Sequence, residues 1–109
     1  MPQELRQITF GPPEIMSAIT EYHRHRSLAL PRGTPVKCLI TDRPVLSATI
    51  FIQDDSLATT ELSIGAETLA AALILYCIHR KIPLPVDAQK QLRKLADDKV
   101  ALFVIKPPR

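Results

Sequence analysis

Histidine and arginine side chains are the groups in this sequence whose types and spacing could most readily do chemistry. Residues 23–26 read His-Arg-His-Arg, and a second His-Arg pair occupies positions 79 and 80. Imidazole and guanidinium groups bind phosphates and other anions. On a helix, however, His23 and His25 would point about 200° apart, so these two rings cannot bind the same metal ion.

The two His-Arg pairs support the hypothesis of a weak anion-binding or nucleic-acid-binding surface. Basic residues of nearby predicted strands would extend it, and the full set is His25, Arg26, His79, Arg80, Lys37 and Arg43. The aromatic ring of Phe51 would then offer a nucleobase a surface on which to stack. The alternative is that both pairs end helices, where the helix dipole favours cations without any ligand.

Thiols and carboxylates also occur in pairs, but without the spacing of a metal or catalytic site. Cys38 and Cys77 form no C-x-x-C pattern, and buried free thiols behave as small apolar groups. The pairs Asp54-Asp55 and Asp97-Asp98 suit turns at strand ends. The sequence contains no glycine-rich phosphate loop and no nucleophile motif. We therefore expect no metal, no cofactor and no enzymatic activity.

The overall charge and the apolar runs limit the partners and the location. Fourteen basic residues are interspersed with eleven acidic ones, which gives a formal net charge of +3. The longest apolar run, Leu69 to Ile78, has about half the length of a membrane-spanning helix. Residues 1–10 lack the apolar centre of a signal peptide. We expect a cytoplasmic protein with reduced thiols and no membrane contact.

Prolines and glycines divide the chain into two helices and several strands. Gly11-Pro12-Pro13-Glu14 is a helix start, and the apolar residues after it predict a helix over 12–27. A similar start at Gly65 opens a second helix that ends near Lys81. The residue pattern predicts strands over 6–10, 36–41, 45–53, 60–64 and 99–105. The segment 89–95 is compatible with either an edge strand or a short helix.

The sequence matches itself when it is shifted by 54 residues. Seven identities fall within positions 10–31, whereas unrelated segments would share roughly one or two. The identical pairs are Gly11 and Gly65, Ala18 and Ala72, Tyr22 and Tyr76, His25 and His79, Arg26 and Arg80, Leu30 and Leu84, and Pro31 and Pro85. We infer one domain over 1–109 made of two pseudo-symmetric repeats, about 5–54 and 59–107. The alternative is a coincidence between two amphipathic helices.

This repeat predicts an α+β fold built from a duplicated β-α-β-β unit. A unit of about fifty residues cannot bury both an apolar helix face and an apolar strand face by itself. Two units side by side would share one antiparallel sheet, with the two helices packed on one face of it. The strand order is not determined by the sequence.

The sequence contains more apolar residues than the core of such a domain could bury. The additional ones predict a contact with another chain. The run from Leu69 to Ile78 is apolar all round, and a helix of this kind is normally buried all round. The strand over 99–105 is apolar on both faces, which is typical of a central strand covered twice. The predicted interface residues are Ala71, Ile74, Leu75, Ile78, Phe51 and Phe103. The alternative is that the first helix, loops or the tail at Pro107 and Pro108 cover them.

Taken together, these features predict a small non-catalytic binding or assembly module that acts through protein–protein contacts, with a homodimer as the expected form. The alternative is a weak nucleic-acid or anion binder that uses the basic helix ends. The partner, the pathway and the oligomeric state are not readable from the sequence.

Overall fold

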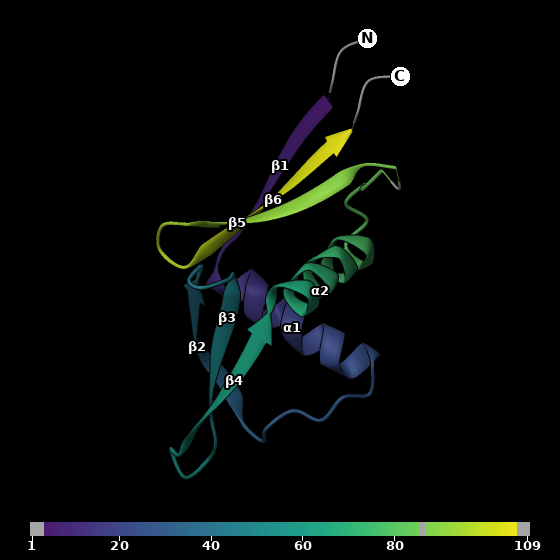
Figure 1. Cartoon of the computed structure of the whole chain (residues 1–109). Helices are drawn as coiled ribbons and strands as arrows, with labels where there is room; N and C mark the ends of the chain where they lie inside the picture. Colours follow the sequence, from purple (N-terminus) through teal and green to yellow (C-terminus); the bar gives the residue numbers. More distant parts are fainter. Residues whose placement is uncertain (1–3, 86, 107–109) are drawn as a thin grey trace.

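The order strand, helix, strand, strand occurs twice along the chain (Figure 1). The structure is a computed structural model that describes residues 4–85 and 87–106. Pro107 and Pro108, together with the end of the predicted second repeat, lie outside the described residues. The elements are β1 (Glu4–Phe10), α1 (Pro12–His25), β2 (Thr34–Thr41), β3 (Ser47–Gln53), β4 (Thr59–Gly65), α2 (Ala66–His79), β5 (Gln89–Leu95) and β6 (Lys99–Lys106).

The two helices have the same length and begin and end 54 residues apart. Each follows a glycine in an extended conformation, and the Glu14 carboxylate accepts a hydrogen bond from the Gly11 N–H at 3.1 Å. Each also ends in the same way. Ser27 and Lys81 adopt φ angles of 54° and 57°, and the next N–H bonds back to a carbonyl five residues earlier. This left-handed C-terminal motif satisfies carbonyls that the helix leaves unpaired.

The strands form two antiparallel sheets of three strands each, so the prediction of one shared sheet is wrong. Sheet A has the order β1-β6-β5, and sheet B has the order β2-β3-β4. Each sheet combines a hairpin from one half of the chain with the first strand of the other half. The class is α+β, as predicted. The structure shows that the order of elements is repeated. That the two halves are pseudo-symmetric repeats stays a prediction.

A hydrogen bond to the β5–β6 turn occupies part of the outer edge of β2. The outer edge of β2 would have to pair with another strand to extend sheet B. Instead the Ile40 N–H donates to Oδ1 of Asp98, in the β5–β6 turn, at 3.0 Å. Asp97 and Asp98 have φ angles of 60° and 56°, as a tight hairpin turn of this hand requires. The turn of sheet A therefore caps an edge of sheet B.

The segment 89–95, which the sequence alone assigns to neither strand nor helix, is the edge strand β5. β6 lies at the centre of sheet A, as its apolar residues on both faces indicated. Val100, Ala101 and Leu102 have no exposed surface. Strand β6 is thus covered on both faces at this end of the sheet.

The core lies where the helices pack on each other and on the sheets. Ala18 and Ala72, at positions 54 apart, are fully buried, and such small side chains let two helices approach closely. Larger buried residues surround them, among them Phe10, Ile15, Ile50, Leu73 and Leu102. Helix α1 contacts β1 and β2, and α2 contacts β3 and β4. The molecule is elongated, 58 × 28 × 19 Å, because one end of sheet A extends past the helices (Figure 1).

The link at Asp98 is testable by substitution. Asp98→Gly removes the acceptor of the Ile40 N–H and keeps a residue that tolerates a positive φ. We expect the free energy of unfolding to fall by about 1–3 kcal/mol, the usual cost of leaving such a donor without its charged partner. Denaturant unfolding measures this, and Asp98→Asn, which retains an acceptor oxygen, should lose clearly less. Equal losses in the two variants would show that the hydrogen bond is unimportant.

Candidate functional site

The ends of the two helices bring the predicted His-Arg pairs together. The rings of His25 and His79 lie edge to face, with centroids 6.2 Å apart. Both helices therefore present their C-terminal ends to the same region, where the negative ends of their dipoles add. Cations at this place are stabilising whether or not a ligand is bound. His23 has a separate role, because it is buried and its Nδ1 lies 2.9 Å from the Ile19 carbonyl oxygen.

A carboxylate that the sequence analysis did not single out occupies this site. Glu21 of α1 lies 3.1 Å from Nδ1 of His79 and 3.1 Å from a guanidinium nitrogen of Arg80. The hydrogen bond from Arg80 is the main reason why the pKa of Glu21 is lowered. The same contact raises the pKa of Arg80, whose guanidinium also stacks 3.6 Å from the Tyr76 ring centroid. Arg80 is therefore held by an acid and by an aromatic ring.

The other His-Arg pair has no such carboxylate. Within residues 4–85 and 87–106, the ion pairs at this site are those of Glu21 with His79 and Arg80. The Arg26 guanidinium instead lies 5.8 Å from the ring centroid of Tyr22. The residue of α2 that lies 54 positions after Glu21 is Leu75. The two halves thus carry the same basic pair with different neighbours.

The remaining two cations of the predicted anion site lie on other elements. Lys37 belongs to β2, on the face opposite the buried Cys38 and Ile40, and its Nζ is 5.8 Å from the Phe51 ring centroid. Arg43 lies in the loop between β2 and β3. The structure therefore gathers four of the six predicted residues at the helix ends and places Lys37 and Arg43 elsewhere.

The predicted interface residues of α2 form one partly exposed stripe. Their spacing of three, one and three places them on the helix side opposite the buried Leu69, Ala72 and Leu73. We call these residues the α2 stripe: Ala71, Ile74, Leu75 and Ile78. Ile78 is 60% exposed and the other three are partly exposed. Phe51 and Phe103 are partly exposed on sheet faces turned away from the helices, so they do not continue this stripe.

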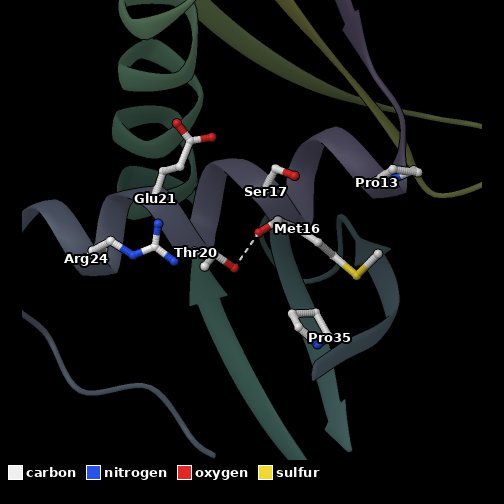
Figure 2. A pocket seen from close by; sticks show the side chains of 7 residues that line it. All are labelled: Pro13, Met16, Ser17, Thr20, Glu21, Arg24 and Pro35. Atoms are coloured by element: carbon white, nitrogen blue, oxygen red, sulfur yellow. Dashed lines mark hydrogen bonds between the residues drawn. The ribbon is translucent and has the colours of Figure 1, made fainter. Parts of the chain in front are cut away.

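The residues of α1 at the same positions are polar and line a shallow groove (Figure 2). We call Ser17, Thr20, Glu21 and Arg24 the α1 stripe, since they lie 54 residues before the members of the α2 stripe. Together with Pro13, Met16 and Pro35 they border a space of about 440 Å³ beside β2. The Thr20 hydroxyl donates to the Met16 carbonyl at 2.9 Å. The sequence alone already shows this contrast, since Thr20, Glu21 and Arg24 occupy the positions at which the second helix is apolar.

The two cysteines are free and buried, as their predicted structural role requires. Burial raises the pKa of Cys38 to about 11, with a smaller contribution from the nearby Asp98, and burial also raises the pKa of Cys77. Within the described residues, no group of three or more His, Cys, Asp or Glu side chains is placed to bind a metal ion.

Three comparisons place no further constraint on the site: no protein-family model, no curated protein and no solved structure matches the chain. Among the described residues, no helix combines the length and the apolar character needed to cross a membrane.

The ion pair at Glu21 predicts a pH-dependent contribution to stability. Because the folded-state pKa lies below the ordinary value of 4.5, the carboxylate stabilises the fold above that pH, and the stabilisation is lost as the pH falls through the folded pKa. Glu21→Gln should lower the urea midpoint slightly at about pH 7, and the difference from wild type should shrink as the pH falls below 4.5 and disappear once the carboxylate is protonated. Glu61→Gln, at an exposed position of β4, is the control. A difference for Glu21→Gln that persists at low pH would refute the ion pair.

The buried thiols should be unreactive in the native protein. A rise of the Cys38 pKa from 9.0 to about 11 reduces the thiolate fraction at neutral pH, by about 100-fold, and limited access slows the reaction further. Ellman's reagent measures this rate, and both thiols should react promptly once the chain is unfolded in denaturant. Rapid reaction of either thiol in the folded protein would contradict the burial.

Proposed function

We propose that this chain is a small non-catalytic assembly module that associates with a second copy of itself through the α2 stripe. One observation carries the proposal. The stripe is apolar and partly exposed, with Ile78 the most exposed, whereas the same positions of α1 carry a serine, a threonine, a glutamate and an arginine. Helix α1 has the same length and carries polar residues at these positions. Apolar side chains there are therefore expected to be buried against another molecule.

A second copy is the partner that fits this stripe most simply. In a twofold arrangement the stripe of one copy packs on the stripe of the other, so all exposed apolar side chains of the stripe are buried at once. Ala71 is small and allows close approach, while Ile74, Leu75 and Ile78 supply apolar area around it. Four residues cover less than the roughly 800 Å² per partner typical of stable complexes. We therefore expect weak association, with a dissociation constant in the micromolar range.

Anion binding at the helix ends is the second candidate, and the observation in its favour is the 6.2 Å approach of His25 and His79. Two features weigh against it. Glu21 already pairs with His79 and Arg80, and the helix ends already stabilise cations there. The apolar α2 stripe has no comparable partner among the described residues, so assembly is the function that we put forward.

The test is to give the α2 stripe the residues of the α1 stripe. Ile74→Thr combined with Ile78→Arg copies Thr20 and Arg24, which α1 already accommodates at the same positions. We expect the double variant to remain folded and to be monomeric at concentrations where the wild type forms dimers. Multi-angle light scattering over a dilution series gives the mass of each.

The matched control is Leu57→Glu, which adds a charge at a residue that is 72% exposed in the loop between β3 and β4. It should have the same mass as the wild type. A wild type that stays monomeric at high micromolar concentration contradicts the proposal. A dimer that survives Ile74→Thr/Ile78→Arg also contradicts it, because the contact would then lie elsewhere.

A further inference from the structure

The strand pairing concentrates positive charge on one of the two sheets. Along the sequence the basic residues are interspersed with acidic ones, but β1, β5 and β6 together carry six basic residues and one acidic residue, Glu4. The strands of sheet B carry one of each, Lys37 and Glu61. The basic residues of sheet A are Arg6, Lys90, Arg93, Lys94, Lys99 and Lys106.

The outer face of sheet A, away from the helices, is centred on an aromatic ring. Val100, Leu102 and Val104 point into the core, so Phe103 of the same strand points to the opposite face. The residues directly across from Phe103 are Gln7 on β1 and Gln91 on β5. The ring is partly exposed, and the Arg93 guanidinium lies 5.8 Å from its centroid.

The charged strand residues of this outer face are both basic. Alternation along the strands places Arg93 and Lys99 on the face of Phe103, and places Glu4 on the opposite face with Arg6. Arg6 and Lys90 donate hydrogen bonds to carbonyls of the loop before β5. They raise the positive potential of the sheet, while Arg93 and Lys99 are the side chains placed to reach a ligand on this face.

We propose that the outer face of sheet A binds single-stranded nucleic acid. An unpaired base stacks on Phe103, the side-chain amides of Gln7 and Gln91 hydrogen-bond its edges, and Arg93 and Lys99 contact the phosphates. A sheet with one partly exposed ring between amides and cations suits a single strand, whose bases are free to stack. This proposal is independent of the assembly through α2, since it uses other residues on another surface.

Sheet B supplies a built-in comparison. Phe51 also lies on a central strand, on the outer face, with a cation 5.8 Å from its ring centroid. Its direct neighbours across the strands are Lys37 and Glu61, so the local charge is balanced. The geometry of the ring and its cation is therefore shared, and the surrounding charge differs.

The experiment measures binding of the full chain to a fluorescein-labelled, mixed-sequence DNA strand about 15 nucleotides long by fluorescence anisotropy. The wild type should bind at about 50 mM salt and bind more weakly as the salt rises to about 200 mM. Phe103→Leu should weaken binding at least about fivefold, the effect of removing one stacked base. The matched control Phe51→Leu should bind as the wild type does.

Two further measurements separate stacking from general charge attraction. Heparin has no bases, so Phe103→Leu should bind it as well as the wild type does. The double variant Arg93→Gln/Lys99→Gln should bind both ligands more weakly, and should reduce the slope of log affinity against log salt by about 0.7 for each phosphate that it no longer neutralises. If Phe103→Leu fails to fold by circular dichroism, these exposed cation variants still decide the outcome.

Several results would overturn the proposal. The first is that the wild type does not bind DNA at low salt. The second is that Phe103→Leu binds DNA as well as the wild type does. The third is that the Arg93→Gln/Lys99→Gln variant binds DNA as the wild type does. A fall in the oligomeric mass of Phe103→Leu, without DNA binding by the wild type, would assign this face to a protein contact instead. Loss of dimerisation in the α2 variant with DNA binding intact would leave this proposal standing.

Discussion

The exchange of strands between the two halves of the chain is the constraint on which the rest of the structure depends. β1 pairs with β6, and β4 pairs with β3, so neither half completes its own sheet. Each half forms a two-stranded hairpin by itself, but the third strand of each sheet, with its hydrogen bonds and buried apolar area, comes from the other half. This arrangement holds α1 and α2 against each other, with Ala18 and Ala72 in the shared core.

The two proposed binding surfaces follow from that exchange. Packing of the helices brings His25 beside His79 and leaves the α2 stripe facing outward. Pairing of β1 with the β5–β6 hairpin puts Arg6 into the same sheet as the basic strands β5 and β6. The sequence disperses these residues over about a hundred positions, and the topology gathers them.

Local features of the fold could be predicted from the sequence, and strand partners could not. Gly11 and Gly65 mark the helix starts, and Asp97-Asp98 marks a turn, because these signals act over a few residues. Alternation shows which side chains of a strand are buried, but the same alternation fits several partners. The single-sheet prediction was wrong for that reason. The contact of Glu21 with Arg80 and the bond from Ile40 to Asp98 were also missed, since each joins residues more than fifty positions apart.

Detection of cross-strand contacts by nuclear Overhauser spectroscopy in solution tests the strand exchange most directly. The strand exchange predicts contacts between the backbone protons of β1 and β6, around the pair Ile8 and Leu102, and between β3 and β4, around Ile50 and Leu62. Contacts that instead join β1 to β3 and β4 to β6 would pair the strands of each half within that half. That result would contradict the architecture from which both surfaces are derived.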